Sequence, residues 1–333
     1  MCIITRMASC KRLTKDDLSS LLGCVKTVLL DCDGVLWTRN EAIPGSIDGV
    51  KFLHDIASLN LFKILVLHEG KHVVLLTNNS SKSRDQYVEK CQKLGFSMIK
   101  SEDQVVTTSC VAADFLSNRR ISGKVYVVGS TGIGRELDRY GISHIGIGPD
   151  PVDNYTANAN DISSIQSFGS DLDPEVSTVL VGFDGHFSYP KLVKATSYLH
   201  GTAELYVATN EDSTMPSGNS QITIPGTGSI VKAVTEAAGR DPIVMGKPHK
   251  CLLDYLQRNH LVDRTEDCLM VGDRHNTDII FGRTFGMKTL FVESGDVTME
   301  TILEQKRLGN DDYVPDFVTS CLGDLATLGT NSS

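Results

Sequence analysis

The sequence predicts an α/β protein with parallel β-sheets, and three observations lead to this expectation. Short runs rich in leucine and β-branched residues recur along the 333 residues, and each precedes a longer helical stretch, as in βαβ units. The runs are continuously apolar, as expected for strands covered on both faces. Polar residues follow several runs directly, at the edge where parallel sheets bind ligands. The predicted strands are Val25–Leu30, His72–Leu76, Val125–Val128, Thr178–Val181, Glu204–Ala208, Pro242–Met245, Cys268–Val271 and Lys288–Val292.

The composition narrows the class of protein further. Hydrophobic residues make up 41% and charged residues 22% of the chain, which suits a packed core and excludes a disordered or fibrous protein. The formal net charge of −9 repels polyanions, so a general nucleic-acid binder is not expected. The most apolar stretch, residues 59–76, is interrupted by Lys63, His68, Glu69 and Lys71, and therefore predicts no membrane span.

The nine cysteines are odd in number, scattered and without a C-x-x-C pair. They indicate neither a zinc site nor a disulfide framework, and a reducing compartment fits them best. Residues 1–20 lack the uninterrupted apolar segment of a signal peptide. A cytoplasmic location is therefore expected.

Four of the predicted strands end in residues suited to binding one divalent metal ion and one phosphate. These segments carry carboxylates, one lysine and a hydroxyl next to two amides. The segments are residues 31–34 (DCDG), 77–80 (TNNS), 246–248 (GKP) and 272–278 (GDRHNTD).

The first segment offers a nucleophile and an acid/base group. Asp31 and Asp33 are two residues apart, so in extended geometry their side chains point the same way. Asp31 as nucleophile would form an aspartyl phosphate, a mixed anhydride that water cleaves. Asp33 would protonate the leaving alkoxide and then activate the water, which requires it to be protonated when substrate arrives.

The other segments supply the metal ligand and the phosphate contacts. Two anions that approach each other need a cation between them, and Mg²⁺ prefers oxygen ligands such as Asp31 and Asp273. Lys247 as a point charge and Thr77 as a hydroxyl donor would hold the phosphoryl oxygens. Asn78 and Asn79, which follow Thr77, are also assigned to substrate binding.

The middle of the chain lacks these polar strand ends although it has strands and helices of its own. We therefore expect an inserted α/β domain at residues 118–225, between two parts of a catalytic core at residues 24–117 and 226–333, with residues 1–23 as an N-terminal segment. The turn-rich stretch around Pro225, Gly226 and Gly228 would be the returning linker.

Together, the motifs resemble those of the haloacid dehalogenase superfamily. Within it they are most similar to the branch of eukaryotic phosphoglycolate phosphatase, also called glycerol-3-phosphate phosphatase, and pyridoxal phosphatase. The similarity runs from about Leu13 to about Leu322. It rests on residues 31–37 (DCDGVLW), 76–84 (LTNNSSKSR), 246–248 (GKP) and 270–278 (MVGDRHNTD).

The resemblance implies a Rossmann-like core with a large α/β cap inserted between the Thr77 and Lys247 motifs, a Mg²⁺ requirement and small phosphomonoester substrates. It makes Asp31 both nucleophile and metal ligand. Asp33 is then the acid/base and gives its backbone carbonyl to the metal. Asp273 is the third protein ligand and Asp278 supports the water shell of the metal. A homodimer formed through the cap is also implied.

A segment of the predicted cap, residues 181–189 (VGFDGHFSY), resembles the part of this branch that places a histidine over the substrate. His186 is the residue concerned. Its imidazole offers a hydrogen-bond donor to a phosphate or to the organic part of the substrate.

The chain also departs from the family pattern. The apolar segment Ser58–Glu69 looks inserted, either as an extra element or as translated intron, and His275-Asn276 stand where relatives commonly have an apolar residue and an acid. The glycines of residues 129–134 (GSTGIG) suggest a dinucleotide site but depart from G-x-G-x-x-G, so a strand-to-helix turn is the simpler interpretation. Cys32 is expected to pack beneath the first motif, with oxidation sensitivity as the alternative.

The expected function is hydrolysis of small phosphomonoesters, with 2-phosphoglycolate or glycerol-3-phosphate favoured. Pyridoxal 5′-phosphate or a phosphoprotein is the alternative substrate, because the core motifs do the same chemistry whatever the cap admits. A catalytically impaired member that binds a phosphometabolite is the alternative of another class.

Overall fold

A computed structural model describes the chain except for residues 1–9, 59–71, 151–161, 170, 216–220 and 331–333. Of the segment that we expected to be inserted, Ser58 ends a helix, and residues 59–69 lie outside the described residues. The chain forms two compact units. The first comprises residues 1–77, 88–106 and 256–333, and the second comprises residues 78–87 and 107–255.

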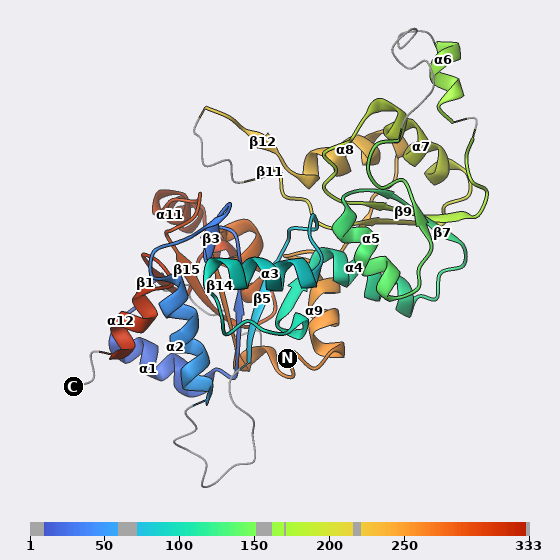
Figure 1. The fold of residues 1–333 in the computed structure, drawn as a ribbon. Coiled ribbons are helices and arrows are strands. Elements are labelled where there is room, and N and C mark those ends of the chain that lie inside the picture. Colours follow the sequence, from blue (N-terminus) through green and yellow to red (C-terminus); the bar gives the residue numbers. More distant parts are fainter. Residues whose placement is uncertain (1–9, 59–71, 151–161, 170, 216–220, 331–333) are drawn as a thin grey trace, which may run out of the picture. The chain divides into compact units, whose positions relative to one another are not determined.

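A seven-stranded sheet forms the centre of the first unit (Figure 1). Its strand order is β1-β16-β15-β14-β2-β5-β6, and the pairs from β1 across to β5 are parallel. All four residues of β2 are apolar or threonine and all are buried, as a central strand covered on both faces requires. The strands are β1 (Lys11–Arg12), β2 (Thr27–Leu30), β5 (His72–Thr77), β6 (Val105–Thr107), β14 (Cys268–Gly272), β15 (Lys288–Val292) and β16 (Phe317–Thr319).

Helices connect these strands, and local sequence signals set where they begin. The Thr14 hydroxyl oxygen accepts a hydrogen bond from the backbone N–H of Asp17, and the Asp17 carboxylate accepts one from the Thr14 backbone N–H, so a capping box starts the first helix. The C-terminal helix α12 packs on both α1 and α2 (Figure 1). The helices are α1 (Lys15–Cys24), α2 (Ser46–Ser58), α10 (Ile280–Thr284), α11 (Met299–Arg307) and α12 (Asp324–Thr330), with α3 (Arg84–Leu94) and α9 (Lys250–Arg258) each crossing a boundary between the units.

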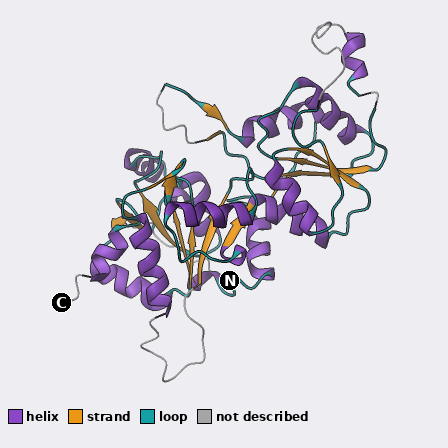
Figure 2. Ribbon diagram, in the orientation of Figure 1, coloured by secondary structure: helices purple, strands orange, loops and turns teal. Residues whose placement is uncertain are grey.

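The second unit contains a five-stranded parallel sheet of order β13-β10-β9-β7-β8 (Figure 2). Helices α7 and α8 pack on each other and on β9, while α4 packs on α5. The strands are β7 (Lys124–Val128), β8 (His144–Ile145), β9 (Val176–Val181), β10 (Leu205–Ala208) and β13 (Ile243–Val244). The helices are α4 (Thr108–Asn118), α5 (Thr131–Arg139), α6 (Ile162–Ser167), α7 (Tyr189–His200) and α8 (Thr227–Ala238).

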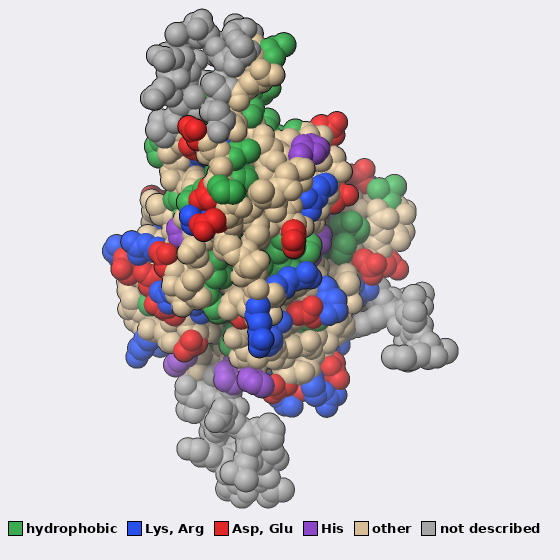
Figure 3. Space-filling model, turned by 90° about the vertical axis from the view of Figure 1, so that its right-hand side faces the viewer, with side chains coloured by type: hydrophobic (Ala, Val, Ile, Leu, Met, Phe, Trp, Pro, Cys, Tyr) green, Lys and Arg blue, Asp and Glu red, His purple; other side chains and the backbone are tan. Residues whose placement is uncertain are grey.

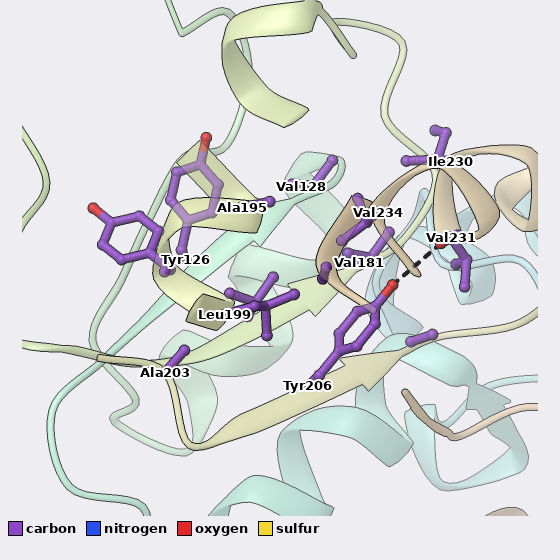
Figure 4. Packing of buried hydrophobic residues seen from close by; sticks show 14 of the residues in the cluster. Tyr126, Val128, Val181, Ala195, Leu199, Ala203, Tyr206, Ile230, Val231 and Val234 are labelled. Carbon is purple, nitrogen blue, oxygen red and sulfur yellow. Dashed lines mark hydrogen bonds between the residues drawn. The ribbon is translucent and has the colours of Figure 1, made fainter. Parts of the chain in front are cut away.

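The core of this second sheet is apolar, and the hydroxyl of Tyr206 within it is directed to the backbone of Val231 (Figure 4). Tyr126 and Tyr198 pack at a ring-centroid distance of 5.0 Å. The hydroxyl of Tyr206 donates a hydrogen bond to the backbone carbonyl of Val231 at 3.2 Å. Buried tyrosines need such partners, because an unpaired hydroxyl in an apolar core is destabilising.

The α/β class with parallel sheets is confirmed, and all eight predicted runs form strands. Strand β13, which lies within residues 226–333 of the predicted catalytic core, pairs with β10 in the sheet of the second unit. The domain boundaries at residues 117/118 and 225/226 stay a prediction.

Two features of the described residues concern membrane spans and surface charge. None of their helices combines the length and the hydropathy that a membrane span requires. Acidic and basic side chains lie interspersed on the face shown in Figure 3.

Candidate active site

Three buried carboxylates meet at one edge of the first sheet. Asp31 directly follows β2, and Asp273 directly follows β14, the parallel neighbour of β2. A π-helical turn over His275–Ile279 then brings Asp278 back to the same edge. Oxygen atoms of Asp31, Asp273 and Asp278 lie within 4.8 Å of one another, and the three residues are only 8%, 1% and 1% exposed.

Glycine backbones enclose this carboxylate cluster. Gly34 has a φ of +88°, and a Cβ atom there would lie 2.4 Å from Oδ2 of Asp273. A Cβ atom at Gly295 would lie 1.8 Å from the same oxygen. The hydroxyl of Ser294 donates a hydrogen bond to the Gly34 carbonyl at 2.7 Å, which joins the two glycine turns. No side chain fits at either position without displacing the Asp273 carboxylate.

The donor set fits a hard divalent cation. Carboxylates this close repel each other when ionised, and a cation between them removes the repulsion. Mg²⁺ takes oxygen ligands and is commonly bound through one or two carboxylates with water completing the shell. Asp278 contributes to the cluster itself, and its Oδ2 also accepts a hydrogen bond from the Arg274 backbone N–H at 3.1 Å.

The carboxyl group of Asp33 is oriented by the single tryptophan of the chain. Trp37 begins β3 (Trp37–Thr38), which pairs with β4 (Glu41–Ala42), and its indole Nε1 donates a hydrogen bond to Oδ1 of Asp33 at 3.0 Å. The indole is fully buried, packs edge-on against Phe96 at 5.7 Å, and lies beneath the ammonium of Lys90 at 4.2 Å. Asp33 is therefore adjacent to a rigid hydrogen-bond donor.

Thr77 and Cys32 complete the predicted residues of the first unit. Thr77 is the last residue of β5, the other parallel neighbour of β2, and is 3% exposed. Cys32 is fully buried, which agrees with the expected packing role. At the fourth motif, burial lowers the pKa of His275, whose ring lies 5.7 Å from that of Tyr313.

In the second unit, Asn78 holds the backbone of Lys247 from both sides. Its Oδ1 accepts a hydrogen bond from the Lys247 N–H at 2.8 Å, and its Nδ2 donates to the Lys247 carbonyl at 3.1 Å. The same Nδ2 donates to Asp212 at 3.1 Å. The carbonyl of Asn78 accepts from Asn210 at 2.7 Å and from Thr108 at 2.8 Å. The turn after β5 and the Lys247 turn therefore form one hydrogen-bonded network.

Asn79 and His186 lie elsewhere in the second unit. The Oδ1 atom of Asn79 accepts hydrogen bonds from the N–H and the hydroxyl of Ser81 at 2.8 and 2.7 Å, which closes a local turn. His186 is exposed on the loop that follows β9, and its backbone N–H donates to Asp184 at 2.8 Å.

The glycine turn of residues 129–134 has a packing role. A Cβ atom at Gly132 would lie 2.6–2.7 Å from three backbone atoms of Lys82, so the start of α5 packs directly against the backbone of Lys82. Nearby, the fully buried carboxylate of Glu136 accepts hydrogen bonds from the backbone and the guanidinium of Arg84. The Arg84–Glu136 contacts fix the segment that follows Asn79. The close approach to Lys82 explains the glycine at position 132, so no nucleotide is needed to explain it.

Sequence reasoning missed several residues of these networks. Gly295 and Ser294 follow β15, so the rule that directed attention to other strand ends also applies to them. Trp37 is the last residue of the first motif, residues 31–37, but the motif does not indicate its hydrogen bond to Asp33. Asp212 and Asn210 carry no local signal, because their contacts with Asn78 span more than 130 residues of sequence.

Comparison with known proteins identifies the family. The haloacid dehalogenase-like hydrolase family matches residues 28–143, and an HAD-hydrolase-like family matches residues 244–325. Glycerol-3-phosphate phosphatase of Homo sapiens is 35% identical over 328 residues, which cover 96% of this chain and 95% of the relative. Chloroplastic phosphoglycolate phosphatase 1A of Arabidopsis thaliana is 34% identical over 313 residues, which cover 93% of this chain and 79% of the relative.

A solved structure supports the fold assignment. The structure of glycerol phosphate phosphatase from Mycobacterium tuberculosis in complex with magnesium has a TM-score of 0.68 and 22% identity, and the match covers 92% of this chain and 77% of that one. The identity with glycerol-3-phosphate phosphatase over nearly the whole length, and the family matches at residues 28–143 and 244–325, show that this chain belongs to the haloacid dehalogenase-like hydrolases.

Proposed function

We propose that the chain is a Mg²⁺-dependent phosphatase of small phosphomonoesters that works through an aspartyl phosphate. The observation that carries the proposal is the buried cluster of Asp31, Asp273 and Asp278 at the ends of two adjacent parallel strands. The printed names of relatives favour glycerol-3-phosphate or 2-phosphoglycolate as the substrate. The magnesium complex of the mycobacterial structure supports the choice of metal.

Two carboxyl groups perform the chemistry. The Asp31 carboxylate attacks phosphorus, the bond to the alkoxide oxygen breaks, and Asp33 gives its proton to that oxygen. Water then attacks phosphorus, Asp33 takes a proton from this water, and inorganic phosphate leaves with Asp31 restored. Asp31, Asp273 and the Asp33 carbonyl would bind Mg²⁺, and Asp278 would support its water shell. The bound metal would neutralise the charge of the phosphoryl group and of these carboxylates.

The remaining predicted residues bind the substrate. Lys247 and Thr77 would hold the phosphoryl oxygens, and Asn79 and His186 would contact the substrate beside them. The buried network around Asn78 supports a substrate role for Lys247, because it fixes the backbone from which the ammonium extends.

The test is phosphate release by the purified full-length chain with and without Mg²⁺. We expect turnover of glycerol-3-phosphate or 2-phosphoglycolate that requires the metal and is abolished in Asp31→Asn. The matched control is Asp254→Asn, an exposed carboxylate that pairs with Lys250 on the surface. Pyridoxal 5′-phosphate and a phosphopeptide are the comparison substrates. A folded wild-type chain without turnover of any of these would overturn the proposal in favour of a binding protein.

Two further expectations follow the same proposal. We propose a cytoplasmic enzyme that forms a homodimer through the cap at residues 118–225. Light scattering of the purified chain measures the mass directly, and a monomer at micromolar concentration would contradict the dimer.

A further inference from the structure

A fully buried lysine stands out in the second unit because none of the proposed chemistry uses it. Lys191, on α7, is 0% exposed, and its ammonium donates a hydrogen bond to Oδ2 of Asp184, which is itself 4% exposed. A second hydrogen bond runs from the ammonium to the carbonyl of Gly146 at 2.9 Å. The ion pair thus joins α7, the loop after β9 and the turn after β8.

The other oxygen of the same carboxylate holds His186. Oδ1 of Asp184 accepts a hydrogen bond from the His186 backbone N–H at 2.8 Å. His186 and the preceding Gly185 are exposed, whereas Asp184 is buried. The exposed tip of the loop is therefore fixed to the interior through one carboxylate, with one oxygen for the lysine and one for the histidine backbone.

Fold stability alone does not account for the pair. Taking a lysine and an aspartate out of water has a large desolvation cost, and well-packed apolar residues of similar volume are often as stabilising or more so. A charged pair in such a position gives orientation, because hydrogen bonds to an ionised group are short and directional. The group that this pair orients is the segment of residues 182–188, here called the His186 segment.

We infer that Asp184 and Lys191 are positioning residues that hold the His186 segment in one conformation and thereby set substrate affinity and choice. The inference rests on the proposed function, in which His186 contacts the substrate. The reacting carboxylates lie on other strands, so loss of the pair should weaken substrate binding and leave the chemical step of the bound substrate largely intact.

The decisive variant is Asp184→Asn, because an amide has one acceptor oxygen where the carboxylate has two. The Lys191 ammonium and the His186 N–H are both donors, so the amide oxygen serves only one of them. Without the amide oxygen the buried ammonium would keep only the Gly146 carbonyl, so it takes the oxygen, which leaves the His186 N–H facing the amide NH₂. The substitution keeps the size and shape of the side chain.

The chain offers a matched control in Asp150. Its carboxylate also has two donors, with Lys194 at 2.7 Å and the Tyr126 hydroxyl at 3.0 Å, and Lys194 lies on α7 like Lys191. Asp150→Asn therefore makes the same chemical change beside the same helix without touching the His186 segment.

Steady-state kinetics are the first measurement, with glycerol-3-phosphate and 2-phosphoglycolate as substrates. We expect Asp184→Asn to raise KM roughly tenfold, about the loss of one hydrogen bond to substrate, with kcat within about twofold of wild type. Asp150→Asn should change neither constant. Adding His186→Ala to Asp184→Asn should have little further effect on KM, whereas His186→Ala alone should raise it. Unchanged KM in Asp184→Asn, or fully additive effects with His186→Ala, would overturn the inference.

Hydrogen exchange of the His186 backbone amide gives a readout that does not depend on activity. We expect this amide to be protected in the wild type and in Asp150→Asn, and to exchange at least about tenfold faster in Asp184→Asn. Equal exchange rates in all three chains would overturn the positioning role. If the wild type hydrolyses none of the substrates but shows the expected exchange pattern, the proposed function fails and the holding of the segment stands.

A second variant guards against misfolding of the first. Asp184→Leu with Lys191→Met replaces the pair by apolar side chains of similar size, which is expected to keep the fold. It also removes both acceptors, so the same rise in KM and the same faster exchange at His186 are expected. A wild-type KM in this folded variant would contradict the inference.

Discussion

The carboxylate cluster leaves no room for a Cβ atom at Gly295. A Cβ atom at Gly295 would lie 1.8 Å from Oδ2 of Asp273, so Gly295→Ala must move that carboxylate. We expect the variant to need roughly tenfold or more Mg²⁺ for half-maximal activity, in the range seen when residues supporting metal ligands are lost. The measurement is a Mg²⁺ titration of phosphate release together with calorimetry of Mg²⁺ binding.

The control for this prediction is Gly23→Ala, on the exposed face of α1, where nothing lies within 4 Å of the added Cβ. It should leave the Mg²⁺ requirement unchanged and raise the free energy of unfolding by about 0.5–1 kcal/mol, because alanine is the better helix former. Equal Mg²⁺ requirements in Gly295→Ala and the wild type would show that the cluster is not the metal site.

Trp37 provides the second prediction at this scale. Trp37→Phe keeps an aromatic ring against Phe96 and removes the N–H that bonds Asp33. We expect kcat to fall roughly tenfold, a part of the ~10²- to 10⁴-fold that general acid–base catalysis contributes, with KM little changed. Burst and steady-state kinetics with glycerol-3-phosphate or 2-phosphoglycolate measure this change in kcat. A wild-type kcat would mean that Asp33 needs no support from the indole.

Between elements, Asn78 joins two turns that are far apart in sequence. Asn78→Asp keeps the acceptor for the Lys247 N–H but places an anionic oxygen against the Lys247 carbonyl and the Asp212 carboxylate. We expect the inhibition constant of inorganic phosphate to rise about tenfold or more, because the Lys247 ammonium, which we propose binds the phosphoryl group, loses its fixed backbone. Asn118→Asp, at the end of α4, is the control, since its amide bonds only a carbonyl of its own helix among the contacts described. Equal inhibition constants for phosphate in Asn78→Asp and the wild type would contradict the role.

Elements with a long apolar run could be predicted from sequence, and short ones could not. The run Cys268–Val271 predicted β14 because its apolar residues are continuous. Strand β1 consists of Lys11 and Arg12 and has no apolar residue, so its strand character comes only from pairing with β16 at the edge of the sheet. The pairing of β2 with β14, which brings Asp31 to Asp273, is a long-range relation that local patterns do not contain. The motifs therefore indicated the acidic residues of the cluster, whereas the contacts of Gly34 and Gly295 with Asp273 and of Trp37 with Asp33 are visible only in the fold.

For the whole molecule, the position of the one tryptophan determines which unit a fluorescence experiment reports. Trp37 lies in the first unit, whereas backbone circular dichroism reports both. Coincident thermal transitions by the two probes would show that the units unfold together, as two-state unfolding requires. If the transitions are separate, the transition seen by fluorescence belongs to the first unit, and the other transition seen by circular dichroism belongs to the second.

Acid should weaken the first unit through Asp324, which begins α12. Burial raises the pKa of this carboxyl, but the Thr319 hydroxyl and the backbone N–H groups of Ser320 and Cys321 outweigh burial and hold the pKa below its usual value. A carboxyl with a lowered folded-state pKa adds stability above its unfolded pKa of about 3.9, and this stability is lost as the pH falls through the folded value. Asp324→Asn should therefore lower the fluorescence unfolding midpoint at pH 7 and have little effect near about pH 2. An equal decrease in the midpoint at both pH values would show that the side chain of Asp324 stabilises the first unit without any contribution from its charge.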